Sequence, residues 1–194
     1  MTGATPNHPP TGAPGRPDYD PLLLERARRI RLLALDVDGV LTDGKLYYDN
    51  AGNEMKAFCA RDGLGMQALQ HYDVRLAIIT GRSSASVTRR MQELQVNFVY
   101  QGQSDKMGAF RTLLRDSGVE AAAICYAGDD WVDIPLLDRA GLAVTVADAD
   151  PRVKTRVHWI TRMGGGQGAV REICDLLLTA QGHDQQWLAE LLNR

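Results

Sequence analysis

Short apolar runs and longer amphipathic stretches alternate along most of the chain. The short runs are rich in Leu, Ile and Val and end at Gly, Asp or Ser, which predicts buried strands over 32–36, 74–80, 98–100, 122–127, 142–146 and 157–161. The longer stretches space their apolar residues as one face of a helix does, which predicts helices over 64–71, 84–94, 106–116, 134–139 and 169–178. This alternation predicts an α/β fold, a three-layer Rossmann-like parallel sheet with helices on both faces.

Three segments depart from the alternation. Two short strand-like runs, 45–49 and 54–59, flank Asn50-Ala51-Gly52-Asn53, which predicts an inserted β-hairpin. A helix is predicted over 21–30, where Pro21 suits a first helical position. Residues 1–18 hold five of the eight prolines and are predicted to be a disordered lead-in. We therefore expect one domain over 19–181, followed by a helical tail over 182–194.

Charge and cysteine content narrow the class of protein. The 22 Lys and Arg residues nearly balance the 24 Asp and Glu residues, so no basic excess indicates a nucleic-acid or lipid-coating protein. No apolar run approaches the ~20 residues that a membrane-spanning helix needs. The three cysteines are far apart and suit a reducing compartment. We expect a cytoplasmic protein with no nucleic-acid and no membrane partner.

Polar side chains follow the ends of four predicted strands. Parallel strands present their carboxyl ends, where ligands bind, at one edge of the sheet. The side chains expected there are Asp36 and Asp38, then Thr80 with Gly81 and Arg82, then Lys106, and finally Asp129, Asp130 and Asp133.

Carboxylates packed together repel one another unless a cation lies among them, and Mg²⁺ prefers such oxygen ligands. A lysine, a threonine hydroxyl and a glycine N–H suit the oxygens of a phosphoryl group. The sequence therefore predicts a phosphoryl-transfer site. We expect Asp36 to bind Mg²⁺ and attack phosphorus, and Asp38 to act as general acid and then general base. The backbone carbonyl of Asp38 is a further candidate ligand for Mg²⁺.

At this point the chain resembles a known family. In this order, Asp36-x-Asp38-Gly-Val-Leu-Thr, Thr80-Gly81-Arg82, Lys106 and Gly128-Asp129-Asp130-x-x-Asp133 are similar to the four motifs of the haloacid dehalogenase-like phosphatases. Within them, Phe58-x-x-Arg61-Asp62-Gly63 and Gly165-x-x-Gly168-Ala-Val-Arg-Glu resemble the 3-deoxy-D-manno-octulosonate 8-phosphate phosphatase family. The resemblance covers about residues 22–180.

The resemblance implies roles for particular residues. The side chains of Asp36 and Asp129 would bind Mg²⁺, and Thr80, Gly81 and Lys106 would hold the phosphate. The loop of Arg61, Asp62 and Gly63, together with Asp38 and Arg82, would meet the sugar acid. The implied reaction is hydrolysis of 3-deoxy-D-manno-octulosonate 8-phosphate to the free sugar acid and phosphate, a step toward lipopolysaccharide in a Gram-negative bacterium.

Several alternatives stay open from the sequence. The substrate could be a nine-carbon, sialic-type sugar-acid phosphate, or the chain could be a non-catalytic assembly partner with the same fold. Asp130 and Asp133 could be acids at a helix N-terminus rather than ligands. Arg90 lies eight residues after Arg82 and could contact the substrate carboxylate or belong to a solvated face.

The gaps between the motifs are too short for a cap domain over the site. An open site admits water, so we expect a neighbouring subunit to cover it. The resemblance implies a homotetramer in which the hairpins associate and a glycine-rich segment reaches a neighbour's site. Met163 to Gly166 is expected to act as a hinge for that segment.

Overall fold

The computed structural model describes residues 18–193, so the predicted lead-in lies outside the described residues except for Asp18. The predicted parallel sheet is confirmed: six strands lie in the order β5-β4-β1-β6-β7-β8, and every neighbouring pair is parallel. The strands are β1 (Leu32–Leu35), β4 (Arg75–Ile79), β5 (Phe98–Tyr100), β6 (Ile124–Ala127), β7 (Leu142–Thr145) and β8 (Trp159–Ile160).

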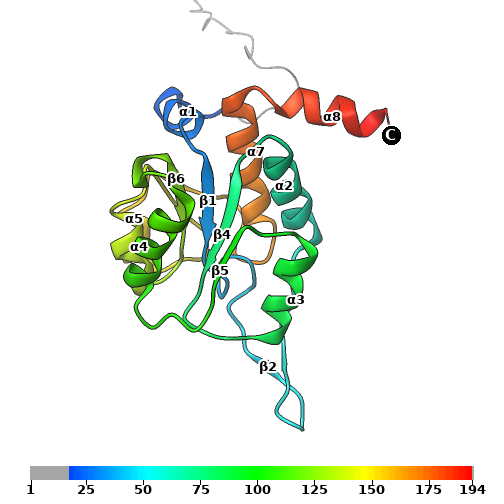
Figure 1. Ribbon diagram of the computed structural model, residues 1–194, viewed down its shortest axis with the longest axis vertical. Helices are drawn as coiled ribbons and strands as arrows, with labels where there is room; N and C mark the ends of the chain where they lie inside the picture. Colours follow the sequence, from blue (N-terminus) through cyan, green and yellow to red (C-terminus); the bar gives the residue numbers. More distant parts are fainter. Residues whose placement is uncertain (1–17, 194) are drawn as a thin grey trace, which may run out of the picture.

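Helices cover both faces of this sheet and complete the three predicted layers (Figure 1). One face carries α1 (Pro21–Arg28), α2 (Ala60–His71), α3 (Ala85–Glu93) and α7 (Ala169–Gln181). The other face carries α4 (Lys106–Ser117), α5 (Ile134–Leu137) and α6 (Pro151–Lys154), the last of which was not predicted. Two short 3₁₀ turns, η1 (Ala121–Ala123) and η2 (Trp131–Asp133), flank β6.

The core follows the alternation of side chains along the central strand. Leu33 and Leu35 of β1 pack with α2 and α7, whereas Leu32 and Ala34 point to the opposite layer. All four side chains are completely buried, as expected for a parallel strand covered on both faces. The sheet is therefore a rigid platform for the residues that follow its strands.

The predicted hairpin is present but shorter than expected. Its strands β2 (Tyr47–Tyr48) and β3 (Glu54–Met55) pair Tyr47 with Met55, and the hairpin projects beyond the carboxyl ends of the sheet (Figure 1). Pairing stops after Met55 because Lys56 turns its side chain inward and Cys59 already begins the turn into α2.

The glycine-rich segment, residues 164–168, includes most of the predicted hinge, Met163 to Gly166, whose movement stays a prediction. The Gly166 N–H donates to the Val40 carbonyl at 3.1 Å, and a Cβ on Gly165 would lie 1.9 Å from the Gly39 carbonyl oxygen. Glycine is needed at position 165 because two backbones approach closely, and at position 166 because its φ of 67° is a conformation that favours glycine. The segment packs on the loop after β1 of its own chain.

The C-terminal tail forms a helix, α8 (Asp184–Leu192), which returns to its own chain. The Trp187 ring lies 5.3 Å from the His71 ring, and Glu190 accepts a hydrogen bond from the Tyr72 hydroxyl at 3.1 Å. The tail thus rests on the carboxyl-terminal end of α2. Over residues 18–193, none of the helices combines the length and apolar character that crossing a membrane requires.

Candidate active site

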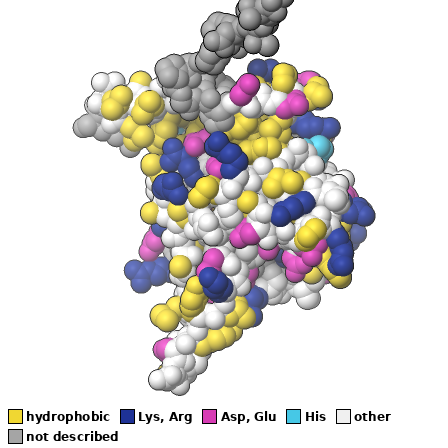
Figure 2. Space-filling model, turned by 180° about the vertical axis from the view of Figure 1, so that it is seen from behind, with side chains coloured by type: hydrophobic (Ala, Val, Ile, Leu, Met, Phe, Trp, Pro, Cys, Tyr) yellow, Lys and Arg dark blue, Asp and Glu magenta, His cyan; other side chains and the backbone are white. Residues whose placement is uncertain are grey.

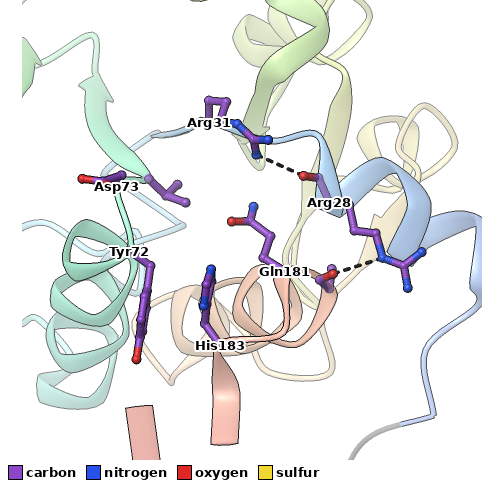
Figure 3. A pocket seen from close by; sticks show the side chains of 8 residues that line it. Arg28, Arg31, Tyr72, Asp73, Gln181 and His183 are labelled. Atoms are coloured by element: carbon purple, nitrogen blue, oxygen red, sulfur yellow. Dashed lines mark hydrogen bonds between the residues drawn. The ribbon is translucent and has the colours of Figure 1, made fainter. Parts of the chain in front are cut away.

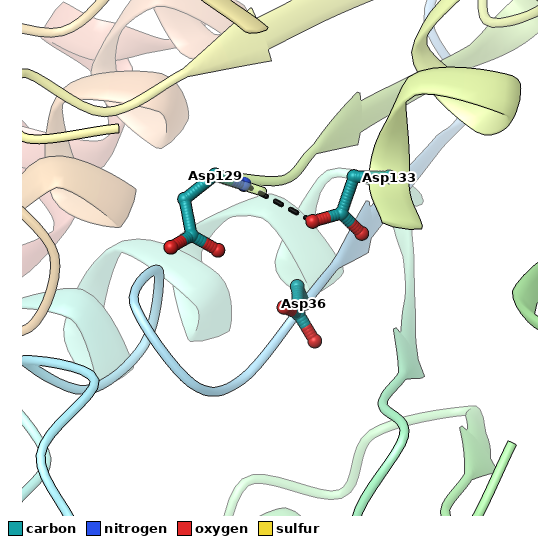
Figure 4. Close-up of side chains that lie close together, drawn as sticks. All are labelled: Asp36, Asp129 and Asp133. Carbon is teal, nitrogen blue, oxygen red and sulfur yellow. Dashed lines mark hydrogen bonds between the residues drawn. The ribbon is translucent and has the colours of Figure 1, made fainter. Parts of the chain in front are cut away.

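Three carboxylates meet where β1 and β6 end side by side (Figure 4). One oxygen from each of Asp36, Asp129 and Asp133 lies within 4.8 Å of the others. We call these three residues the acid cluster. The two strands bring them together because Asp36 N–H donates to the Ala127 carbonyl at 2.9 Å, so the adjacent loops leave the sheet at the same level.

Asp133 is completely buried and all its hydrogen-bonding capacity is used. Its Oδ1 accepts from Lys106 Nζ at 2.7 Å and from the Tyr126 hydroxyl at 2.6 Å. Its Oδ2 accepts from the backbone N–H groups of Asp129 and Asp130, each at 3.2 Å. Asp133 therefore organises the acid cluster and leaves no lone pair directed at a cation. Sequence reasoning missed Tyr126, whose only signal was one hydroxyl in an otherwise apolar strand.

Asp130 caps η2. Its carboxylate accepts a hydrogen bond from the Trp131 N–H at 2.7 Å, and Asp133 bonds back to the Asp130 backbone N–H in a capping box. Of the two alternatives for Asp130, the structure favours the acid at a helix N-terminus.

Lys106 is the cation that the structure brings to the acid cluster. Its Nζ lies 3.0 Å from Asp36 Oδ1 as well as 2.7 Å from Asp133 Oδ1, and the side chain is only 6% exposed. Burial alone would lower the pKa of Lys106, but the charges of Asp36 and Asp133 outweigh it and raise this pKa. The ammonium group is therefore held in its charged form at the first residue of α4.

The acid cluster fits a divalent cation. Burial, followed by the neighbouring carboxylates, raises the pKa of Asp36 and of Asp129 to about 7. Asp129 Oδ1 is buried and accepts no hydrogen bond from any described residue. One lysine cannot balance two buried carboxylates and a half-buried one, whereas a cation with a preference for oxygen ligands can. Asp36 and Asp129 are the residues that would hold Mg²⁺.

Asp38 faces away from the acid cluster toward the hairpin. Its Oδ1 is bonded to Lys56 Nζ, and its Oδ2 lies 3.9 Å from Arg82 Nε. Both cations also contact Glu54, at 3.5 Å for Lys56 and 2.8 Å for Arg82. The predicted pair Asp38 and Arg82 is therefore brought together, with two hairpin residues that sequence reasoning missed. The sequence feature that could have indicated them is their spacing: Glu54 and Lys56 are two residues apart and therefore lie on the same side of the hairpin.

The predicted phosphate-binding residues follow adjacent parts of the sheet. Thr80 comes directly after β4, which neighbours β1, and is 2% exposed. Gly81 follows it at the surface. Lys106 begins α4. The three residues thus lie at the same edge of the sheet as Asp36.

The segment predicted to meet the sugar acid behaves differently. Arg61 Nη2 donates to the Gln167 carbonyl at 3.0 Å, and the Asp62 carboxylate is buried against α7. A Cβ on Gly63 would lie 2.3 Å from Arg90 Nη2, and Arg90 pairs with Glu93 at 3.5 Å. Arg61, Asp62, Gly63 and Arg90 therefore lie together around the first turn of α2, and Asp62 is not open to a substrate.

A cavity of about 540 Å³ lies at the opposite, amino end of the sheet (Figure 3). Arg28, Arg31, Tyr72, Gln181 and His183 are among its lining residues. Arg31 precedes β1, whereas the acid cluster follows it, so this cavity is separate from the acid cluster.

Comparison with known proteins identifies the family of the chain. Residues 96–173 match the family model described as haloacid dehalogenase-like hydrolase. The 3-deoxy-D-manno-octulosonate 8-phosphate phosphatase KdsC of Escherichia coli K12 is 48% identical over 160 residues, which cover 82% of this chain and 85% of that protein.

Two crystal structures are similar as well. The 3-deoxy-D-manno-octulosonate 8-phosphate phosphatase of Yersinia pestis has a TM-score of 0.83 and 45% identity, with 84% of this chain and 88% of that chain covered. The enzyme of Moraxella catarrhalis, in complex with magnesium, phosphate and KDO, has a TM-score of 0.86 and 42% identity, with 88% and 98% covered. The chain therefore belongs to the 3-deoxy-D-manno-octulosonate 8-phosphate phosphatase family of haloacid dehalogenase-like hydrolases.

Proposed function

We propose that the protein hydrolyses 3-deoxy-D-manno-octulosonate 8-phosphate to the free sugar acid and phosphate, with Mg²⁺ as cofactor. The observation that carries the proposal is the largely buried acid cluster, with Lys106 ion-paired to two of its members. The relatives that carry this name and the relative solved with magnesium, phosphate and KDO support the same substrate. This activity would supply the sugar acid for lipopolysaccharide.

Asp36 is proposed as the nucleophile. One carboxylate oxygen attacks phosphorus, the bond to the sugar oxygen breaks, and an aspartyl-phosphate forms. Thr80, the Gly81 N–H and Lys106 hold the phosphoryl oxygens, and the charge of Lys106 stabilises their growing negative charge. Bound Mg²⁺, held by Asp36, Asp129 and the Asp38 carbonyl, would neutralise charge on the same oxygens.

Asp38 is proposed to move the protons. It donates one to the departing sugar oxygen and then accepts one from the water that hydrolyses the aspartyl-phosphate. Lys56 and Arg82 hold Asp38 at the mouth of the site, on the hairpin side where the leaving group would lie. Arg61, Gly63 and Arg90 remain candidates for contact with the sugar acid.

Phosphate release tests the proposed reaction. The purified chain should release phosphate from 3-deoxy-D-manno-octulosonate 8-phosphate with Mg²⁺ and lose this activity in EDTA. A nine-carbon sialic-type sugar-acid phosphate and a simple hexose phosphate serve as comparisons. Preference for the nine-carbon substrate would replace the substrate assignment, and no release from any ester would contradict the phosphatase assignment.

A homotetramer is proposed to complete the site. Four apolar side chains of the hairpin are substantially exposed: Leu46, Tyr47, Tyr48 and Met55. Figure 2 shows apolar side chains gathered around the projecting hairpin. Burying them between hairpins would cover the neighbouring mouth of the site. Light scattering should report a tetramer, and a fully active monomer would contradict this arrangement.

The cytoplasm is proposed as the compartment. The three cysteines, Cys59, Cys125 and Cys174, are all free thiols, which suits a reducing environment. Fractionation of the native host should place the activity with cytoplasmic enzymes.

A further inference from the structure

Asp62 is a buried carboxylate whose partner is distant in the sequence. The residue is 1% exposed and lies in the first turn of α2. Its Oδ1 accepts a hydrogen bond at 2.8 Å from the backbone N–H of Arg171, 109 residues later. Its Oδ2 is also buried and accepts no hydrogen bond from any described residue. The carboxylate thus faces the start of α7 and not the mouth of the site.

The start of α7 lacks a local cap, which explains what Asp62 supplies. The residue before the helix is Gly168, whose φ of 107° suits glycine and disfavours the Ser or Asp that would normally accept a first-turn N–H. The Arg171 N–H has no acceptor within the helix. Asp62 provides that acceptor from another helix, and its negative charge lies at the positive end of the α7 dipole.

Arg61 binds Gln167, the residue that precedes Gly168 in the chain. Its Nη2 donates to the Gln167 carbonyl at 3.0 Å, and a Cβ on Gly168 would lie 3.0 Å from the same nitrogen. Two consecutive residues of α2 therefore fix the chain on both sides of Gly168. They determine where the glycine-rich segment can lie.

The glycine-rich segment in turn contacts the loop that carries Asp38. Gly166 N–H bonds to the Val40 carbonyl, and Gly165 packs on the Gly39 carbonyl. Gly39 follows Asp38 directly, and a Cβ on Gly39 would lie 2.0 Å from Asp129 Oδ2. A continuous series of contacts thus connects Asp62, through the glycine-rich segment, to the backbone beside Asp38 and to the side chain of Asp129.

We infer that Asp62 is a positioning residue: it clamps the glycine-rich segment onto the loop after β1, fixes Asp38 and Asp129 through that loop, and makes no contact with the sugar acid. The inference rests on the proposed phosphatase activity. It replaces the expectation that Asp62 belongs to the substrate-binding residues.

Two substrates separate positioning from substrate contact. Asp62→Ala and Asp62→Asn are assayed in the full chain with Mg²⁺ on 3-deoxy-D-manno-octulosonate 8-phosphate and on p-nitrophenyl phosphate, which has no sugar and no carboxylate. Asp62→Ala should lower kcat by about 10- to 100-fold on both esters, as loss of an outer-shell partner does, with little change in KM. Asp62→Asn keeps an acceptor oxygen for Arg171 and should recover most of kcat.

The matched control is Asp175→Ala. Asp175 lies on α7, is half-buried, and accepts a hydrogen bond from the Arg171 side chain at 2.7 Å. Its removal should leave kcat unchanged on both esters. Amide hydrogen exchange gives a readout without turnover: residues 39–42 and 164–168 should exchange faster in Asp62→Ala and as in the parent protein in Asp175→Ala.

Three results would overturn the inference: a loss confined to the sugar-acid ester and expressed in KM, a kcat like that of the parent protein, or unchanged exchange in both segments. If Asp62→Ala does not fold, Asp62→Asn carries the test: a kcat and KM close to those of the parent protein on both esters would support positioning, and a loss confined to the sugar-acid ester and expressed in KM would overturn it. An unaltered protein that cleaves neither ester would contradict the proposed function, whereas the exchange result would still decide the role of Asp62.

Discussion

The acid cluster and the hairpin lie on either side of Asp38 and are built in opposite ways. The acid cluster follows strands in the middle of the sheet, two of its three carboxylates are buried, and Asp133 alone accepts four hydrogen bonds. The hairpin has two residues in each strand and exposes its apolar side chains. The sheet and the segments packed on it can therefore fix the acid cluster within one chain, whereas the residues around the leaving group depend on a small hairpin that a neighbouring subunit would support.

The largest effect that separates the two regions should come from Asp36→Asn. Asparagine keeps the shape of the side chain but removes the nucleophile, so kcat should fall by more than about 10⁴-fold. Because one of several repelling carboxylates is lost, the melting temperature of the metal-free variant at pH 7.5 should not fall. Phosphate release and thermal unfolding measure the two quantities, and near-normal turnover would eliminate the nucleophile assignment.

Asp38→Asn tests the residue between the two regions. Loss of a general acid should reduce kcat by about 10²–10⁴-fold while the fold is preserved. The reduction should shrink for an ester with a good leaving group such as p-nitrophenolate, because that group needs no proton. An equal reduction on both esters would contradict the acid role.

Asp133→Ala tests whether the stability of the acid cluster depends on the hydrogen bonds that Asp133 accepts. The change leaves Lys106 buried beside an unsupported Asp36 and removes the acceptor for the Tyr126 hydroxyl. We expect the free energy of unfolding to fall by about 3–5 kcal/mol, as for other broken buried ion pairs. Urea unfolding measures it. Tyr126→Phe, the control, should lose only about 1 kcal/mol, and equal losses would contradict the central role of Asp133.

Magnesium binding should be linked to pH through Asp36 and Asp129. Their folded-state pKa of about 7 lies above the unfolded value, so the stability they contribute to the metal-free protein is full below pH 4 and is lost as pH rises through 7. Mg²⁺ competes with those protons. At 100 times its Kd, it should stabilise by about 2.7 kcal/mol at pH 8, about 5–10 °C, and by much less at pH 5.5.

Differential scanning calorimetry at the two pH values measures this difference. Asp129→Asn should abolish the magnesium-dependent rise, because it removes one of the two carboxylate ligands. A rise in melting temperature that is equal at both pH values would contradict proton competition at the acid cluster.

The smallest effect is expected in the hairpin. Lys56→Met keeps the length of a buried side chain but removes the pairs with Asp38 and Glu54, so kcat/KM should fall by about tenfold. Lys45→Met is the matched control, since Lys45 is exposed on the same hairpin and pairs with Asp43. Its kcat/KM should stay within about twofold. A control as impaired as Lys56→Met would assign the effect to the hairpin as a whole.

The sequence was enough to predict which residues lie at the carboxyl edge of the sheet. It was not enough to predict contacts between segments that are distant in the chain. Asp36, Thr80, Lys106 and Asp129 could be placed together because parallel strands end at one edge whatever packs beneath them. Lys56 could not be assigned, because its contact with Asp38 depends on where the hairpin stops pairing. Asp62 looked like part of a substrate loop because its partner, Arg171, is 109 residues away and contributes only a backbone N–H.

The hydroxyl of Tyr126 has a consequence for how the protein can vary. Its ring belongs to the apolar layer beneath α4 and α5, and its oxygen ends on Asp133. Repacking that layer, even with residues of matching volume, would shift the oxygen and therefore the ammonium group that shares the same acceptor. Evolutionary selection for core packing and selection for catalytic rate therefore act on the same side chain, Tyr126.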